Sequence, residues 1–380
     1  MNLGISHLQS CISGIMSSAF NCLALVAVFA CCAEATSILP SFIGLGDWGG
    51  YALGSPYTTN VAAVAAEMVK IKSTYSPDFV INVGDNFYYC GIQNTSDYQI
   101  MTDFVKPYAS LDLPFYSILG NHEYGYNVSA QLDYAANNVN WIMDDRYYSR
   151  RMEISSGSAS AYITFIFLDT NPCYSDYTST SSSGWDPCGS EYPTCSVGDS
   201  DDDFEGTCYF HTNIMTQNCS AQYEWFTSTL ADVDEDDWLI VVGHHPLDEV
   251  DIEDFVSPLI ARGFALYMNG HTHSLNQYTI NNSGAWITTG AGAMVDTADQ
   301  TFELTSLKLD GKDIPAHTKL DSGKVTGSFS YSTVFSSKTA GFTFHQFSSD
   351  LTSLTTQFVS YTGSVLHTFS VNKAGIVSST

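Results

Sequence analysis

The chain has 380 residues, of which 44% are hydrophobic and 13% aromatic, so it can bury a large core. It carries 13 basic and 40 acidic residues, a net charge of −27, which excludes the basic surface that a nucleic-acid partner requires. We interpret the negative charge as a feature that keeps the protein soluble.

Residues 1–35 predict a signal peptide. An apolar run over 19–32 leads to the small-x-small triplet Ala33-Glu34-Ala35, after which we expect cleavage. An uncleaved membrane anchor is the alternative, which the short apolar run disfavours, and no later segment predicts a membrane span. The sequence therefore predicts secretion, with delivery to a vacuole or lysosome as the alternative.

Cysteines and glycosylation sequons agree with export. Four of the ten cysteines lie in the predicted signal peptide, and the other six are Cys90, Cys173, Cys188, Cys195, Cys208 and Cys219. An even number in an exported chain predicts disulfide bonds, whose pairing the sequence leaves open. A thiolate metal site is the alternative, but no C-x-x-C pair occurs. Sequons predict N-glycosylation of surface loops at Asn94, Asn127, Asn218 and Asn281.

Strands and helices alternate along most of the chain, which predicts an α/β fold. Strands are predicted over 38–45, 78–83, 114–119, 161–168, 238–242, 265–268 and 285–289, and helices over 59–75 and 220–233. Residues 300–380 are rich in Ser and Thr, with alternating Phe, Val and Leu. This pattern favours antiparallel strands that complete a sheet over an adhesive tail.

Residues 171–219 predict a Cys-rich, acidic insertion in a catalytic domain that spans 36–380. The segment holds five of the six mature cysteines and an acidic cluster at Asp199, Asp201, Asp202 and Asp203. Acidic loops can bind calcium, but the spacing of an EF-hand is absent, so we interpret the cluster as solvated surface. We interpret the whole segment as a disulfide-tied surface insertion and not as a separate domain.

Five short segments each place a hard-metal ligand directly after a predicted strand. They are Gly46-Asp47, Gly84-Asp85-Asn86-Phe87-Tyr88, Gly120-Asn121-His122, Gly243-His244-His245 and Gly270-His271-Thr272-His273. Loops at the carboxyl ends of strands converge on one rim of an α/β sheet, so these ligands can meet. Any one segment alone is typical of an ordinary turn, whereas the five together favour a metal site. The glycines allow tight turns and close approach of the backbone.

The types of ligand match two metal ions. Carboxylate and phenolate oxygens suit a trivalent ion, whereas imidazole and amide oxygen suit a divalent first-row metal. Asp85 can bridge the ions through its two oxygens. On an extended segment the spacing of two between His271 and His273 directs their side chains to opposite sides, one for each ion. Two ions about 3.5–4 Å apart can clamp a phosphate and activate water.

These segments resemble the metallophosphoesterases of the calcineurin-like superfamily. Tyr88, three residues after Asp85, narrows the resemblance to the purple acid phosphatases, and the small tartrate-resistant animal-type branch is the most similar one. The segment 127–131, which follows the Asn-His pair, is also similar to that branch. The resemblance covers about residues 40–370 without the insertion. It implies a four-layer αββα sandwich of two mixed β-sheets flanked by helices.

The resemblance implies a secreted acid phosphatase that hydrolyses phosphomonoesters by in-line attack of a metal-bound hydroxide. A ferric ion would be held by Asp47, Tyr88 and His273, and a divalent ion (iron, zinc or manganese) by Asn121, His244 and His271, with Asp85 as the bridge. His122 would orient the phosphate or help to protonate the leaving oxygen, close to Asn121. His245 has two interpretations, a phosphate contact or a histidine packed behind the ligands.

The chain departs from this branch in two places. Glu123 follows the Asn-His pair where the branch usually has Asp. No histidine lies between His245 and His271, where a second outer histidine is expected, and Glu253 or Asp251 is a candidate replacement. Two alternatives stay open: a phosphodiesterase or other metallophosphoesterase with a different metal pair, and a non-catalytic exported glycoprotein that retains the fold. The sequence implies no oligomeric state.

Overall fold

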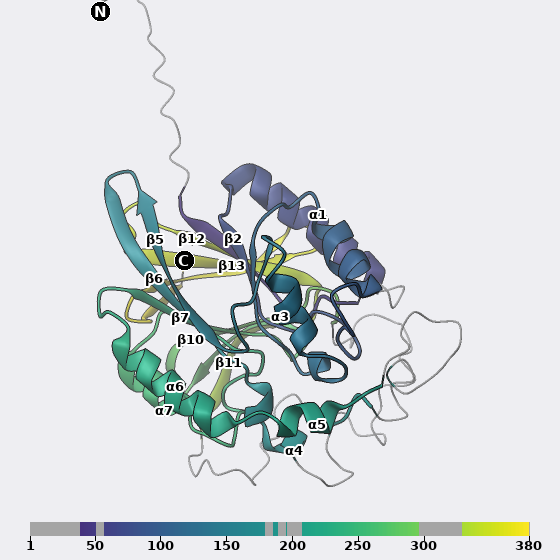
Figure 1. Ribbon diagram of the computed structural model, residues 1–380. Helices are drawn as coiled ribbons and strands as arrows, with labels where there is room; N and C mark the ends of the chain where they lie inside the picture. Colours follow the sequence, from purple (N-terminus) through teal and green to yellow (C-terminus); the bar gives the residue numbers. More distant parts are fainter. Residues whose placement is uncertain are drawn as a thin grey trace, which may run out of the picture. The chain divides into compact units, whose positions relative to one another are not determined.

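The computed structural model describes residues 39–50, 57–178, 185–188, 195, 207–295 and 329–379. Within them, two mixed β-sheets lie between layers of helices (Figure 1). Helices α1 (Tyr57–Tyr75) and α3 (Ser129–Ala135) flank one sheet, and α6 (Cys219–Asp232) and α7 (Val256–Arg262) flank the other. This arrangement confirms the expected four-layer αββα sandwich. The predicted signal peptide and the acidic cluster lie outside the described residues.

The first sheet has eight strands in the order β15-β14-β13-β12-β1-β2-β3-β4. Its parallel part consists of β1 (Ser41–Leu45), β2 (Phe79–Asn82), β3 (Phe115–Ser117) and β4 (Trp141–Ile142). Its antiparallel part consists of β12 (Gly341–Phe347), β13 (Ser353–Ser360), β14 (Val365–Asn372) and β15 (Val377–Ser379). The C-terminal strands therefore complete a sheet, as predicted, by pairing with β1.

The second sheet has the order β11-β9-β10-β8-β7-β6-β5. Its strands are β5 (Tyr148–Ser156), β6 (Ala159–Phe167), β7 (Trp238–Val242), β8 (Leu266–Asn269), β9 (Leu275–Ile280), β10 (Ser283–Thr289) and β11 (Tyr331–Ser337). Strands β6, β7, β8 and β10 are parallel to one another. The strand predictions did not include β5 or β9.

Shorter helical segments connect these strands. They are η2 (Ile100–Val105), α2 (Lys106–Tyr108), η3 (His122–Tyr124), η4 (Asn171–Cys173), α4 (Ser175–Thr178) and α5 (Phe210–Met215). Segments η4, α4 and α5 lie in the predicted insertion, so part of it is helical.

Aromatic side chains fill the space between the two sheets. Phe42 of β1 stacks on Phe79 of β2 with ring centroids 5.4 Å apart, and both meet the edge of Phe165 from β6. Every residue of β1, β2 and β7 is buried, because parallel strands of this kind are covered on both faces. This packing fixes the positions of the strand ends that carry the candidate ligands.

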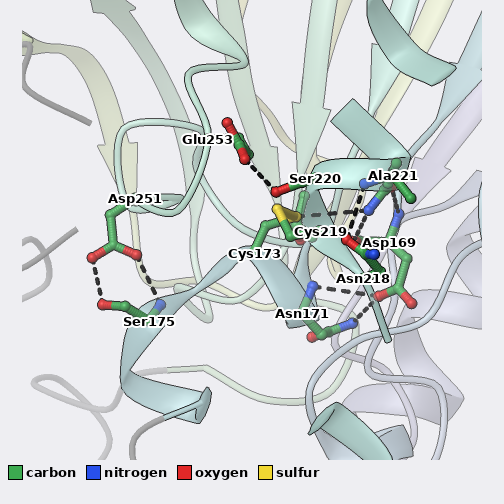
Figure 2. The surroundings of a disulfide bond; sticks show 12 residues. Asp169, Asn171, Cys173, Ser175, Asn218, Cys219, Ser220, Ala221, Asp251 and Glu253 are labelled. Carbon is green, nitrogen blue, oxygen red and sulfur yellow. Dashed lines mark hydrogen bonds between the residues drawn. A yellow bond between two sulfur atoms is a disulfide. The ribbon is translucent and has the colours of Figure 1, made fainter. Parts of the chain in front are cut away.

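Within the described ranges, three disulfides pair the six cysteines that lie outside the predicted signal peptide: Cys90–Cys195, Cys173–Cys219 and Cys188–Cys208. Figure 2 shows the second, which joins η4 to the start of α6. The prediction of disulfides is confirmed, and they are compatible with an oxidising compartment. The four sequon asparagines are exposed. Among the described residues, no helix is both long and apolar enough to cross a membrane.

His345 is a titratable group buried in the core. It lies in β12 between the hydroxyls of Thr343 and Thr356, at 2.8 and 2.9 Å, and stacks on Phe42. Burial lowers its pKa from an ordinary value of 6.5 to about 3. The unfolded chain therefore binds a proton at this residue over a pH range in which the folded chain does not. The contribution of neutral His345 to the free energy of unfolding is therefore largest above about pH 6.5, and it decreases as the pH falls toward 3.

We expect His345→Gln to reduce the loss of stability on acidification. Between about pH 6 and pH 4 the free energy of unfolding should fall less steeply than in the wild type, by about 1 kcal/mol per pH unit. Urea unfolding at a series of pH values measures this slope. His367→Gln, at a half-buried position of β14, should change it less. An unchanged slope in His345→Gln would contradict the linkage.

Candidate metal centre

The carboxyl ends of five strands meet where the two sheets face each other. Asp47, Asp85 and Asn121 follow β1, β2 and β3 of the first sheet, and His244 and His271 follow β7 and β8 of the second. The backbone N–H of His271 donates to both carboxylate oxygens of Asp47 at 3.0 Å, which joins the sheets directly. The structure therefore brings together residues that are far apart in the sequence.

One group of potential ligand atoms surrounds the side-chain oxygen of Asn121. His244 Nε2 lies 3.0 Å from Asn121 Oδ1, and His271 Nδ1 lies 3.1 Å from the same oxygen. His244 Nε2 is also 3.3 Å from Asp85 Oδ2. These are the residues that the resemblance assigned to a divalent ion, and they lie together.

A second group surrounds the hydroxyl of Tyr88. This hydroxyl lies 3.0 Å from Asp85 Oδ2, 3.3 Å from Asp47 Oδ1 and 3.2 Å from His273 Nε2. His273 Nε2 is also 3.6 Å from Asp47 Oδ1. Asp85 Oδ2 therefore lies between the two groups, where a bridging carboxylate is expected.

The centre is buried on one side and open on the other. Asp47 and His244 are 0% exposed and Asp85 is 1% exposed. The side chains of His271 and His273 are 25% and 29% exposed. Solvent therefore reaches the centre along the loop that carries these two histidines.

The orientation of His244 fits a cation. Its Nδ1 lies 2.8 Å from the carbonyl oxygen of Val83, which leaves Nε2 facing the oxygens of Asn121 and Asp85. A nitrogen lone pair that faces two oxygens is unfavourable unless a proton or a cation lies between them. A carbonyl that orients the far nitrogen in this way is typical of metal-binding histidines. The ligand atoms of Asp47, Asp85 and His244 lie within 4.8 Å of one another.

Charges in this buried space influence one another strongly. Burial would lower the pKa of His244, but Asp85 raises it to about 9. Burial also opposes ionisation of Asp85, yet His244 and His122 hold the pKa of its carboxyl well below the usual value. Burial, together with the charge of Asp85, raises the pKa of Asp47 well above its usual range. Cations would relieve this conflict between two buried carboxyl groups.

The backbone directs the candidate ligands through an uncommon conformation. Of nine non-glycine residues with positive φ in the described chain, four are candidate ligands: Asp47 (54°), Asp85 (51°), His271 (71°) and His273 (47°). Each left-handed residue costs roughly 1 kcal/mol. The expectation that His271 and His273 alternate on an extended segment is therefore wrong. Two left-handed positions separated by Thr272 direct these side chains to different groups instead.

Two glycines allow the strand ends to approach the carboxylates. A Cβ on Gly120 would lie 2.1 Å from Asp85 Oδ1, and a Cβ on Gly270 would lie 2.3 Å from Asp47 Oδ2. Both distances are too short for any side chain, so the predicted role of glycine in close approach is confirmed at these positions.

Glu123 connects two of the ligand loops, a role that the sequence analysis missed. Its Oε1 accepts hydrogen bonds from the backbone N–H groups of Asn86 and Phe87, at 2.9 and 3.0 Å. Its Oε2 accepts from the N–H of Gly120 at 2.6 Å. The loop after β2 is thereby held against the loop after β3. The acidic residue beside the Asn-His pair was the available signal, but its contacts depend on the fold.

His122 and His245 contact different candidate ligands. His122 is 6% exposed, with Nδ1 2.7 Å from the carbonyl oxygen of Tyr89 and Nε2 4.0 Å from Asp85 Oδ2. Because Nδ1–H donates to that carbonyl, the other ring nitrogen, Nε2, faces the centre on the side of Asp85.

His245 packs against His271, with ring centroids 4.3 Å apart. The hydroxyl of Thr170 is 2.7 Å from its Nδ1, and that of Tyr177 is 3.0 Å from its Nε2. Since both ring nitrogens bond to hydroxyls and the residue is fully buried, the geometry favours a histidine packed behind the ligands.

The two candidates for the missing outer histidine lie elsewhere. In Figure 2, Asp251 accepts hydrogen bonds from the backbone and hydroxyl of Ser175, and Glu253 accepts one from the hydroxyl of Ser220. These contacts join loops around the disulfide and do not involve a candidate ligand. Glu249 is the nearby acidic residue instead, with Oε2 3.9 Å from His271 Nε2.

Comparisons with known proteins agree with this geometry. The family model described as calcineurin-like phosphoesterase matches residues 40–275. Tartrate-resistant acid phosphatase type 5 of Oryctolagus cuniculus is 26% identical over 279 residues, which cover 70% of this chain and 77% of that protein. Purple acid phosphatase 7 of Arabidopsis thaliana is 29% identical over 272 residues, which cover 67% and 70%. A solved structure described as GAP50, the anchor in the inner membrane complex of Plasmodium, is similar in fold. Its TM-score is 0.59 at 19% identity, and the match covers 88% of this chain and 89% of that one.

Substitution of Gly120 by Ala should weaken metal binding without preventing folding. The new Cβ would displace Asp85, and displaced ligand geometry typically lowers metal affinity by about 10- to 100-fold. Metal content after dialysis against a graded chelator series measures the change. Gly157→Ala is the control, because no atom lies within 4 Å of its added Cβ, although Gly157, unlike Gly120, has positive φ. It should lower stability and leave metal content unchanged. Equal metal retention by both variants would contradict the prediction.

Proposed function

Because this chain belongs to the calcineurin-like phosphoesterase family, we propose that it is an exported acid phosphatase that hydrolyses phosphomonoesters at a centre of two metal ions. The position of Asp85 carries the proposal. Its Oδ2 lies 3.3 Å from His244 Nε2 in one group of ligands and 3.0 Å from the Tyr88 hydroxyl in the other. The acid phosphatases among the relatives support the same activity.

The ligand types support a ferric ion beside a divalent ion. The ferric ion would be held by Asp47, Tyr88 and His273, the divalent ion (iron, zinc or manganese) by Asn121, His244 and His271, and Asp85 would bridge them. Burial and the charges of Asp85 and Asp47 raise the pKa of Tyr88 well above its usual value. A phenol of this kind ionises only beside a strong positive charge, which favours a trivalent ion. When bound, the two ions supply positive charge for the phosphate and activate water.

His122 is the residue that we assign to the substrate. The Tyr89 carbonyl holds its Nδ1–H, and Nε2 faces the ligands. A phosphate at the centre would therefore meet Nε2, which can hold a phosphate oxygen or deliver a proton to the leaving oxygen. Asn121, the adjacent residue, would place the phosphate within reach of His122. His245 would act indirectly, by supporting the ring of His271 from behind.

Two alternative functions predict different measurements. A phosphodiesterase with another metal pair would be colourless, and Tyr88 argues against it. The support for a non-catalytic role is limited to a similarity in fold with the Plasmodium protein that is described as an anchor. The presence of all seven ligand side chains at one edge of the sheets argues against that role, since a protein without catalytic activity would not need them.

Export is part of the proposal. We propose that residues 1–35 are removed and that 36–380 form the catalytic domain with its insertion. The three disulfides and the exposed sequons support passage through an oxidising compartment. Secretion and delivery to a vacuole or lysosome are equally compatible with these features.

Tyr88→Phe should remove a visible absorption band. We expect the wild-type protein to contain two metal ions per chain, with iron as one of them, and to absorb broadly in the visible range through phenolate-to-iron charge transfer. Elemental analysis and a visible spectrum test this expectation. Tyr108→Phe is the matched control, because Tyr108 is also buried but lies in the core near Trp48. Two metals without iron would reject the ferric assignment and leave a phosphoesterase.

His122→Ala should lower kcat/KM for a generic aryl phosphate by about 10²- to 10⁴-fold, the usual contribution of a positioned acid or base. Metal content should stay at the wild-type level, since His122 is not among the proposed ligands. His367→Ala, in β14 with Nε2 2.6 Å from Gln277 Oε1, should retain full activity. A fully metallated wild-type protein that hydrolyses no phosphate ester would favour the non-catalytic alternative.

A further inference from the structure

The Cys-rich insertion contacts the residue assigned to the substrate. The indole of Trp185 meets the ring of His122 edge-on, with centroids 4.9 Å apart and an interplanar angle of 72°. Trp185 belongs to the turn 185–188 within the insertion. Its indole is half-buried and covers one side of an imidazole that is itself 6% exposed.

The loop after β2 also contacts His122. The ring of Tyr88 lies 4.4 Å from the imidazole centroid at 61°, and that of Tyr89 lies 5.9 Å away at 46°. The Tyr89 carbonyl holds Nδ1 at 2.7 Å. These residues fix one ring nitrogen and one side of the ring. Trp185 meets the ring from a different part of the chain, within the insertion.

Covalent and polar contacts hold the turn that carries Trp185. The backbone N–H of Trp185 donates to Asp176 Oδ2 at 3.1 Å. Three residues later, Cys188 forms the disulfide with Cys208. The turn is therefore anchored at both of its ends by residues of the insertion, and the indole also packs against Cys90 and Tyr126 of the ligand loops.

The indole also packs against other aromatic rings of the insertion. Phe210 of α5 lies 5.2 Å from its centroid at 81°, and Tyr177 of α4 lies 5.7 Å away at 48°. The hydroxyl of Tyr177 reaches Nε2 of His245 at 3.0 Å. The same aromatic cluster therefore contacts both His122 and His245.

We propose that Trp185 is a positioning residue that holds the imidazole of His122 toward the metal centre, and that the Cys188–Cys208 disulfide holds Trp185 in place. The inference rests on the proposed role of His122 in binding phosphate. A reacting group that loses its orientation lowers the rate substantially even when it stays nearby. The insertion is then a structural part of the catalytic site, and its loss lowers activity although the seven proposed metal ligands lie outside it.

A double-mutant cycle between Trp185 and His122 tests this role in the metal-loaded, full-length chain. Trp185→Ala should lower both the affinity for inorganic phosphate and kcat/KM for an aryl phosphate by about three- to tenfold, the effect expected from one edge-to-face aromatic contact. Trp185→Phe retains a ring edge and should stay within about twofold of the wild type. In a His122→Ala background, Trp185→Ala should have no further effect, because Trp185 acts through His122.

Three readouts separate positioning from a general effect on folding. Calorimetry measures phosphate affinity, steady-state assays give kcat and KM separately, and thermal unfolding with metal analysis checks each variant. Trp185→Leu, which keeps apolar volume but no ring, replaces Trp185→Ala if the alanine variant is poorly folded. Equal losses in the presence and absence of His122 would overturn the positioning role.

The outcomes also distinguish this inference from the proposed function. If Trp185 and His122 are coupled in phosphate binding but the protein hydrolyses no ester, the phosphatase function is rejected and the positioning role is retained. If the protein hydrolyses esters but Trp185 and His122 are not coupled in phosphate affinity or in kcat/KM, only the positioning role is rejected. A wild-type protein that neither binds phosphate nor hydrolyses an ester would overturn both.

A second cycle tests the disulfide. Cys188→Ser with Cys208→Ser should lower phosphate affinity and kcat/KM in the same direction as Trp185→Ala, because the turn is released at one end. The disulfide variant should add nothing to Trp185→Ala. Additive losses would show that the disulfide acts on the site by another route and would overturn its part in the proposal.

Discussion

Two carboxylates are buried at the junction of the two sheets, and most of the site follows from the need to stabilise them. Asp47 and Asp85 have almost no contact with water, so the surrounding groups must provide the compensation that water would otherwise give. The N–H of His271 supplies part of it to Asp47, and the imidazole of His244 supplies part of it to Asp85. Strand ends from both sheets must therefore face each other, which requires glycine at 120 and 270 and left-handed backbone at four candidate ligands.

The sequence predicted the parts of the fold that carry a strong apolar pattern. Strand β7 has the predicted bounds, and the other predicted strands differ by up to three residues at their ends. Strand β5 was missed because it lies at the edge of its sheet and alternates exposed polar residues with few buried ones. Strand β9 was missed for the opposite reason, since its buried positions include polar residues such as Asn276 and Gln277.

The candidate site divides in a similar way. Its candidate ligands could be named in advance because each lies in a short segment that begins with a glycine at the end of a strand, and the family resemblance added the role of Tyr88. The left-handed conformation of His271 and His273 could not be predicted, since histidine as a residue type does not indicate a positive φ. Contacts between segments distant in the sequence could not be predicted either. Examples are the hydrogen bonds of Glu123 with two loops and the packing of His245. The insertion seemed a surface feature for the same reason, although its disulfide to Cys90 joins it to the loop that carries Tyr88.

The pairing of β1 with β12 has a consequence for how the centre is assembled. Strand β1, which leads to Asp47, lies between β2 and β12, and Ser41 pairs with Gln346 near the other end of the chain. Contacts so distant in sequence form late in folding. The sheet that positions Asp47 is therefore incomplete during synthesis, while the last strands are still missing. With export as proposed, the ions available in the compartment that receives the finished chain, and not those at the ribosome, would decide which metals are incorporated.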